Sequence, residues 1–103
     1  MNIEETLKQR GNRYGDFMNH AIITQLIKGA MKTSPNWHNN LSEHHKEALE
    51  MIAHKIGRII NGDPDFHDSW HDIAGYATLV ADIIHSKQKA HIPSHSFPER
   101  STT

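Results

Sequence analysis

EALEMIAHKIGRII, residues 47–60, is the stretch that decides the fold class. Its apolar side chains recur at intervals of three and four residues, which is the spacing of a single buried face on an α-helix. They are Leu49, Ile52, Ala53, Ile56 and Ile60. Ser42 can cap this helix and Asn61-Gly62 can end it, so we predict a helix over about residues 43–60.

Helices are also predicted before this stretch. A short one over residues 3–10 ends at Gly11, and a turn-rich connector follows over residues 10–16. Asp16 can cap the next helix, which runs to about Lys32 and has one apolar stripe. The stripe consists of Phe17, Ala21, Ile22, Leu26 and Ala30.

A loop, a last helix and a tail complete the chain. Residues 33–40 include a proline and are predicted to form an ordered loop, in which Trp37 is an anchor packed on the helices. The last helix runs from about His67 to Ser86, and residues 88–103 are predicted to be a flexible tail. No strand pattern occurs. The expected fold is therefore all-α, a single domain over residues 1–87 built as a small bundle of three to four helices.

Composition excludes several functional classes. With 103 residues, 36% of them hydrophobic, the chain is one domain with a modest core. Because so small a chain builds an enclosed pocket most readily between subunits, a homo-oligomer is expected. The net charge of −1 argues against binding of duplex nucleic acid, and no apolar run is long enough to span a membrane. The absence of cysteine and of a recognisable signal peptide makes the cytoplasm the expected compartment.

The candidate functional residues are acidic side chains on two successive helices. Glu47 and Glu50 fall on one strip of the helix over residues 43–60, together with Glu43 and His54. Carboxylate oxygens are the ligands that Mg²⁺ prefers. A strip of acids is also typical of the solvated side of an amphipathic helix, so this helix alone does not decide between the two interpretations.

The last helix adds two more acids at a predicted packing surface. Two apolar stripes follow it, so it is expected to pack on two sides. They consist of Ile73, Ala77, Val80 and Ile84, and of Tyr76, Leu79 and Ile83. Asp72 lies one turn before Tyr76, near a packed interface where a carboxylate needs a partner. One such partner is a Mg²⁺ ion, for which the predicted ligands are Glu47, Glu50, Asp68 and Asp72. The other is an ion pair with Lys55 or Arg58.

The same residues show a family resemblance. The run from Glu47 to Pro64, followed by DSWHDIAGYA at residues 68–77, resembles a family of small uncharacterised proteins of phages and prophages. The match covers most of residues 5–85 and includes RYGDF at residues 13–17. The resemblance implies a protein that acts in the cytoplasm of a bacterial host cell.

More distantly, the helix pair resembles the MazG-like all-α nucleoside triphosphate pyrophosphohydrolases. That family holds Mg²⁺ against the triphosphate with E-x-x-E on one helix and E-x-x-D on the next. Glu47 and Glu50 match the first motif and Asp72 matches the final Asp. Ser69 stands where the second motif has its Glu, and the nearest acid, Asp68, comes one position earlier. The resemblance implies oligomeric assembly and cleavage of the α–β phosphate bond, with Glu47, Glu50 and Asp72 as catalytic residues.

Under this hypothesis the substrate also contacts basic and aromatic side chains. A metal-bound water attacks the α-phosphorus, and Lys55 and Arg58 stabilise the charge on the leaving pyrophosphate. Arg13 and Tyr14 offer a guanidinium and a stacking ring to the nucleotide. A tight turn with a surface tyrosine explains Arg13 and Tyr14 equally well.

Three other hypotheses stay open. A non-catalytic phage protein that sequesters a host nucleotide signal needs a stacking ring from Tyr14 or Tyr76, basic residues for the phosphates and an oligomeric interface. His67 and His71, one helical turn apart, can bind Zn²⁺, Mn²⁺ or Fe²⁺ in the manner of HD-type phosphohydrolases. The third is an interaction module whose acids are only solvated.

Overall fold

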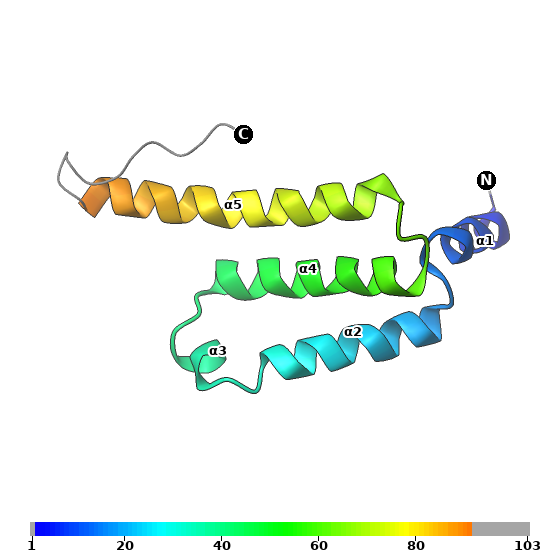
Figure 1. Ribbon diagram of the computed structural model, residues 1–103, viewed down its shortest axis with the longest axis horizontal. Coiled ribbons are helices and arrows are strands. Elements are labelled where there is room, and N and C mark those ends of the chain that lie inside the picture. Colours follow the sequence, from blue (N-terminus) through cyan, green and yellow to red (C-terminus); the bar gives the residue numbers. More distant parts are fainter. Residues whose placement is uncertain (1, 92–103) are drawn as a thin grey trace.

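The computed structural model describes residues 2–91, which form five α-helices and no β-strand (Figure 1). The helices are α1 (Ile3–Tyr14), α2 (Phe17–Met31), α3 (Pro35–Asn39), α4 (Glu43–Asn61) and α5 (His67–His91). The predicted all-α class is confirmed. No helix within residues 2–91 combines the length and the apolar character needed to cross a membrane.

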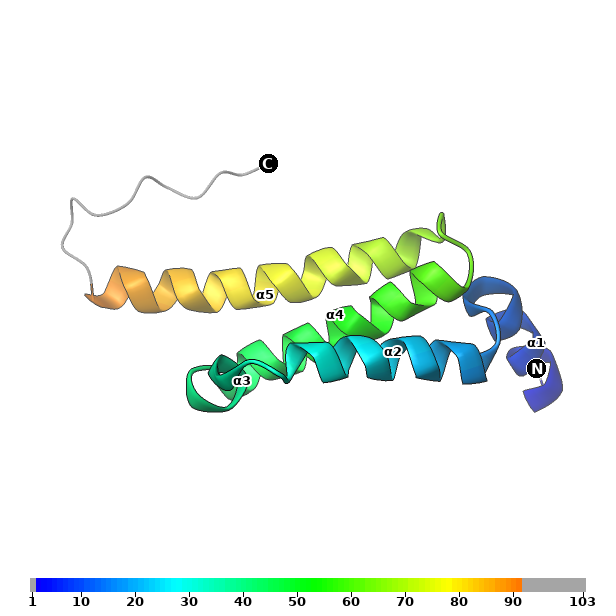
Figure 2. The same ribbon diagram turned by 60° about the horizontal axis from the view of Figure 1, so that its bottom comes forward.

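Helix α4 lies in the middle of the molecule. It packs against α2 and against α5, so that three long helices run side by side (Figures 1 and 2). α1 projects at the end where α2 begins, and α3 lies at the opposite end, in the connection from α2 to α4. Since α4 is the common neighbour, its two long faces decide which side chains of α2 and α5 are buried.

The predicted helix starts at Asp16 and Ser42 are confirmed. The Asp16 carboxylate accepts a hydrogen bond of 3.1 Å from the backbone N–H of Asn19, as the N-cap of α2. At the start of α4, the backbone N–H of Ser42 donates to Nδ1 of His45 at 2.9 Å, as in a capping box. Gly62 caps the other end of α4, as the Asn61-Gly62 pair predicted.

Helix α1 is longer than predicted. It continues through Gly11 and ends at Gly15, where φ is +79°. A single glycine inside a helix costs only about 1 kcal/mol, so Gly11 does not end the helix. A positive φ is a conformation that glycine adopts easily and other residues avoid, so the break falls at Gly15. The connector between α1 and α2 is therefore much shorter than the sequence suggested.

The predicted loop over residues 33–40 contains the short helix α3. The hydroxyl of Ser34 accepts from the backbone N–H of Asn36 at 3.2 Å, and Pro35 occupies the first helical turn, where its missing N–H costs nothing. Trp37 is buried, with 6% of its surface exposed, so its predicted role as an anchor is confirmed. The ammonium group of Lys32 lies 5.7 Å from the centre of the Trp37 ring.

Helix α5 extends to His91 instead of ending at Ser86, so residues 88–91 of the predicted tail are helical. Lysine, glutamine and alanine dominate this extension and are all good helix formers. The remainder of the predicted tail, residues 92–103, lies outside the described residues.

The core is small and partly polar. Among the described residues, the buried apolar side chains are Trp37, Ala48 and Ala53, and the buried polar ones are His20, Thr24 and Ser69. The apolar stripe predicted on α2 points largely away from α4, and Leu26 within it is 69% exposed. The reason is Gly57 of α4, which lies against Thr24 and His20 with no room for a β-carbon. Small and polar side chains therefore bring the two helices together.

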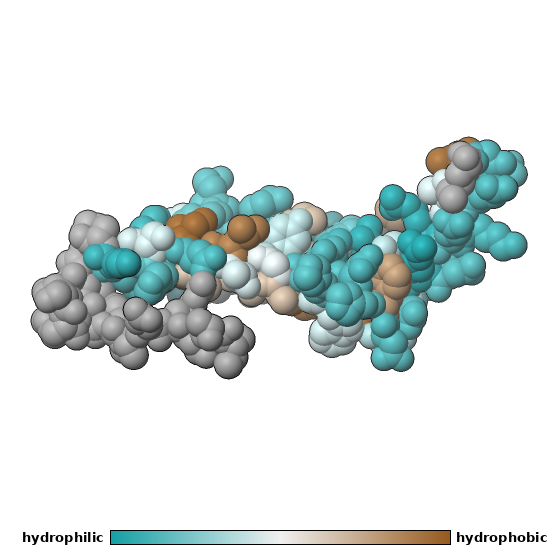
Figure 3. All heavy atoms as spheres, turned by 90° about the horizontal axis from the view of Figure 1, so that it is seen from above, coloured by the Kyte–Doolittle hydropathy of each residue, from teal (hydrophilic) through white to brown (hydrophobic). Residues whose placement is uncertain are grey.

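Helix α5 packs on one side within the chain, although two apolar stripes predicted two packed sides. Its main contact within the bundle is with α4. Leu79, from the second stripe, is exposed, as is Trp70 near the start of the helix. Viewed onto α5, the surface shows hydrophobic patches among hydrophilic side chains (Figure 3). One face of α5 is thus left without a neighbouring helix in the described part of the chain.

Candidate functional site

The predicted metal ligands do not meet within one chain. Glu50 turns toward α2, where its Oε1 lies 3.5 Å from the Nζ of Lys32. Asp72 turns toward α4, where its Oδ2 lies 2.9 Å from the Nζ of Lys55. Across residues 2–91, no three histidine or acidic side chains gather closely enough to hold a metal ion. The carboxylates of one chain therefore do not fit the Mg²⁺ site that the sequence predicted.

The Lys55–Asp72 pair is the ionic partner foreseen as the alternative to a metal ion. The side chain of Lys55 is 11% exposed, and the hydrogen bond that its ammonium group donates lowers the pKa of Asp72 below its usual value. Removing water from an ammonium is costly unless a carboxylate compensates for it. Asp72 thus holds α5 against α4 through this ion pair. Lys55 is engaged in the pair and lies outside the pocket described below.

The remaining candidates for metal binding lie at the surface. Glu47 is exposed, and Asp68 is exposed at the first turn of α5 beside His67, with an O–N distance of 3.7 Å. The rings of His67 and His71 stack with centroids 5.5 Å apart. No third ligand joins them among the described residues, so this histidine pair does not form a complete site in one chain.

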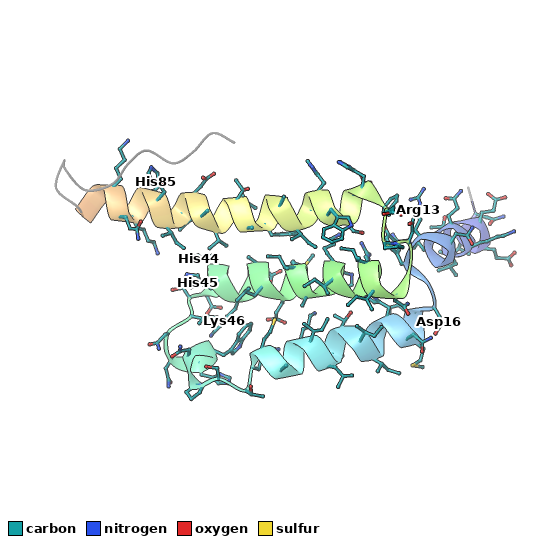
Figure 4. The ribbon with its side chains drawn as sticks, viewed as in Figure 1. Arg13, Asp16, His44, His45, Lys46 and His85 are labelled. Atoms are coloured by element: carbon teal, nitrogen blue, oxygen red, sulfur yellow. The ribbon has the colours of Figure 1, made fainter. Side chains whose placement is uncertain are left out.

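A pocket of about 630 Å³ lies instead where α1, α2 and α4 meet. Its walls combine apolar, aromatic and basic side chains with the connector between α1 and α2. They are Ile3, Thr6, Leu7, Arg10, Gly11 and Tyr14 from α1, Gly15 and Asp16 from the connector, Phe17 and His20 from α2, and His54 and Arg58 from α4. Figure 4 shows this end of the molecule near Arg13 and Asp16, far from His44 and His45.

The connector that forms one wall of the pocket is fixed by the end of α4. The side-chain amide of Asn61 donates to the backbone oxygens of Tyr14 and Asp16, at 2.9 and 2.8 Å. The backbone of Gly62 passes so close to Tyr14 that a β-carbon would collide with it. These contacts hold the Tyr14 backbone in place, so the pocket wall is preorganised rather than a loose loop.

Tyr14 and Arg58 face each other in the pocket. The guanidinium carbon of Arg58 lies 4.2 Å from the centre of the Tyr14 ring, a cation–π contact. The Phe66 ring packs edge to face with the same tyrosine ring, with centroids 5.9 Å apart. Arg13, which was predicted with Tyr14 as a substrate contact, is not part of the pocket lining and lies over Phe66 at 5.1 Å.

Histidines form the wall between α2 and α4. Nε2 of His20 lies 3.4 Å from Nδ1 of His54, and Oγ1 of Thr24 lies 3.4 Å from the same His20 nitrogen. Burial, followed by the charge of Arg58, lowers the pKa of His54 to about 4. Burial also lowers the pKa of His20. Both imidazoles are therefore neutral at physiological pH.

Sequence patterns predicted only part of this pocket. Tyr14 and Arg58 were among the predicted contacts, whereas Arg10, His20 and His54 were missed as ligand contacts. One signal was present, because Arg10 and Tyr14, like His54 and Arg58, are four residues apart and share a helix face. What the sequence lacked was the packing of these two faces against each other.

The pocket is suited to a ligand with a ring and a negative charge. Arg10 and Arg58 supply guanidinium groups, which bind phosphate well, and Tyr14 supplies a flat ring. The acid in the lining, Asp16, is used as the cap of α2. The volume lies within the range of roughly 300–1,000 Å³ that is usual for small-molecule sites.

Comparison with known proteins gives one match. Residues 3–84 match the model of a family described as "Domain of unknown function (DUF6378)". No curated protein and no solved structure matches the chain.

Proposed function

The chain belongs to the DUF6378 family, and we propose that it binds a nucleoside phosphate in the pocket between α1, α2 and α4 and holds it without cleaving it. The observation that supports this proposal is the pairing of Tyr14 with Arg58 at the pocket. When Arg58 turns from the tyrosine ring to the phosphate, its guanidinium can bind phosphate oxygens with charge-assisted hydrogen bonds, and a base can stack on the ring face that it leaves.

The carboxylates favour binding over hydrolysis. A Mg²⁺-dependent pyrophosphohydrolase of the MazG-like kind needs converging acids, whereas Glu50 and Asp72 are each paired with a lysine. Hydrolysis would therefore require the acidic side chains of two chains to converge on the metal ion. In each chain these are Glu47, Glu50, Asp68 and Asp72. Retention of an intact ligand requires no such rearrangement. In a bacterial host cell, a phage protein with this property would sequester a nucleotide signal and so act against host defence.

A homo-oligomer is part of the proposal. The outer strip of α2, formed by Met18, Ile22 and Leu26, is exposed at successive turns of the helix. No large side chain of the described chain is fully buried, so the apolar area removed from water by one chain is small for a domain of this size. A second copy of the chain, seated on this strip, supplies the missing burial.

Binding and cleavage are separated by one experiment. The protein is incubated with ATP, ADP, AMP, 3′,5′-cyclic AMP and the guanosine counterparts, with and without Mg²⁺, and the bound nucleotide is recovered by denaturation. We expect at least one member of the panel to bind by calorimetry and to be recovered intact. Pyrophosphate release that needs Mg²⁺ and is lost in Glu50→Gln would establish the hydrolase instead.

Matched variants test the pocket. Tyr14→Ala should weaken binding at least about fivefold, since a base–aromatic stack is worth roughly 1–3 kcal/mol. Arg58→Gln should weaken it about tenfold, because a charge-assisted hydrogen bond is lost. Tyr76→Ala on α5 and Lys8→Gln, at an exposed position of α1 outside the pocket lining, serve as controls and should retain the wild-type affinity. Equal losses in the control variants would exclude this pocket as the binding site.

The oligomer is tested separately by light scattering at several protein concentrations. We expect the wild type to self-associate and Leu26→Asp to shift toward the monomer. Gln25→Asp adds the same charge to the neighbouring exposed position and should leave the assembly unchanged. A wild-type protein that stays monomeric at high micromolar concentration would contradict this part of the proposal.

A further inference from the structure

The two histidines in the pocket wall form a cross-helix pair. The centres of the His20 and His54 rings are 4.7 Å apart, and the rings meet edge to face with an interplanar angle of 84°. The nitrogens that face each other are 3.4 Å apart, beyond the usual hydrogen-bond range of about 2.7–3.2 Å. The other nitrogen of His20 is buried against Gly57. The pair is thus packed firmly, but it is weakly hydrogen-bonded.

Cations act on this pair from both helices that form it. Arg58 and Lys55 of α4, together with Lys28 of α2, add to the effect of burial and disfavour a proton on His54. On His20 the same effect comes from burial, Arg58 and Lys28. No charge of α5, which also packs against α4, contributes to either shift.

The side of the pocket formed by α1 adds no negative charge. Arg10 and Tyr14 face the pocket from this helix. Asp16 lines it from the connector, but its carboxylate accepts a hydrogen bond as the α2 cap. The pocket therefore combines guanidinium groups with two imidazoles that have no acidic partner. An incoming anion is the group that would balance this charge.

We propose that the His20–His54 pair recognises the phosphate of the bound nucleotide by taking up one proton as that anion enters the pocket. The inference rests on the proposed function, because it assigns a role to two further residues of the same site. The proton comes from solvent and is released again when the nucleotide leaves. No covalent bond forms or breaks.

The physical reason is the balance of charges around the imidazoles. A phosphate beside Arg58 offsets the repulsion from that guanidinium, and it favours the charged form of a neighbouring imidazole. The imidazolium gains a second N–H donor, which can bind a phosphate oxygen. Since the nucleotide-bound state binds more protons than the free state, affinity must rise as the pH falls toward the free-state pKa.

The probe is 3′,5′-cyclic AMP or 3′,5′-cyclic GMP, whichever binds more tightly. A phosphodiester keeps its single negative charge between about pH 5 and pH 8, so any pH dependence arises from the protein. If the nucleotide returns the pair to the ordinary histidine pKa of about 6.5, affinity should rise about tenfold from pH 7.5 to pH 5.5. Calorimetry in two buffers of different ionisation enthalpy should also detect net proton uptake near pH 6.5.

The variants separate proton uptake from packing. His54→Gln keeps a hydrogen-bonding side chain but cannot be protonated, so its affinity should be independent of pH and its proton uptake absent. His38→Gln, at an exposed position of α3, is the control and should behave like the wild type. Circular dichroism at both pH values verifies that each protein is folded.

The outcomes distinguish this inference from the proposed function. Tyr14-dependent binding with equal affinity at both pH values would overturn proton uptake and leave the nucleotide site standing. A pH dependence that persists in His54→Gln would also overturn it. Failure of the whole nucleotide panel to bind would overturn the proposed function and this inference together.

Discussion

The Nζ of Lys55 lies 2.9 Å from the Oδ2 of Asp72 and joins α4 to α5 where the sequence suggested a metal ion. The side chain of Lys55 is nearly buried, whereas that of Asp72 is 42% exposed. The carboxylate therefore compensates for the burial of the lysine. This pair uses one of the four acids that a Mg²⁺ site would need, and it makes the contact between the two helices sensitive to charge.

Replacing Asp72 by Asn should destabilise the fold in a pH-dependent way. The hydrogen bond from Lys55 lowers the pKa of Asp72, so the carboxylate stabilises the folded state fully above its unfolded pKa of about 3.9. This contribution is lost as the pH falls through the lower folded pKa. Urea unfolding should therefore show Asp72→Asn to be less stable at pH 7, with a difference that shrinks in strong acid. Glu43→Gln, at an exposed surface pair, is the control and should change stability little.

Gly57 should be sensitive to substitution and Gly75 should not. A β-carbon at position 57 would collide with the hydroxyl of Thr24 and would come within 3.1 Å of the His20 ring. We expect Gly57→Ala to reduce the free energy of unfolding by about 1–3 kcal/mol, as overpacking does. Gly75→Ala has open space and should stabilise α5 by roughly 0.5–1 kcal/mol. If Gly57→Ala and Gly75→Ala changed the thermal unfolding temperature equally, the close approach of α2 to α4 at Gly57 would be contradicted.

The free energy of unfolding should fall as the pH drops from 6.5 toward 4. The pKa of His54 is lowered from 6.5 to about 4 by burial and nearby cations. Over this range the unfolded chain binds a proton that the folded protein does not, so acid favours unfolding. His54→Gln should flatten this part of the curve of urea midpoint against pH. A curve that is unchanged by His54→Gln, with His38→Gln as the reference, would show that other groups cause the acid sensitivity.

The two tryptophans should differ in their contribution to stability. Trp37 of α3 is buried, so Trp37→Ala should cost about 3–5 kcal/mol. Trp70 is 55% exposed and donates one hydrogen bond, from Nε1 to the backbone oxygen of Pro64 at 2.7 Å. Trp70→Ala should cost about 1 kcal/mol. Chemical denaturation followed by circular dichroism measures the free energy of unfolding of both variants. Similar losses in the two variants would contradict the burial of Trp37 in the core.

Local signals predicted the helices well and their neighbours poorly. Asp16 and Ser42 begin helices because a cap depends on hydrogen bonds between residues two or three positions apart. Gly11 failed as a helix end, because the break needs a positive φ that Gly15 adopts. The candidate site was predicted in part for the same reason. Tyr14 and Arg58 have suitable chemistry, but no local rule relates their positions.

The sequence by itself determined the helical class, the start of α2 and both ends of α4, because these follow from periodicity and capping between near neighbours. The tertiary structure alone decided that polar His20 and Thr24, rather than the apolar stripe of α2, face Gly57. It also decided that Asp72 meets Lys55 instead of converging with Glu50. Such choices depend on the rotation and axial shift of one helix against another. Those are set by the packing of residues far apart in the chain, and the pattern along a single helix does not contain them.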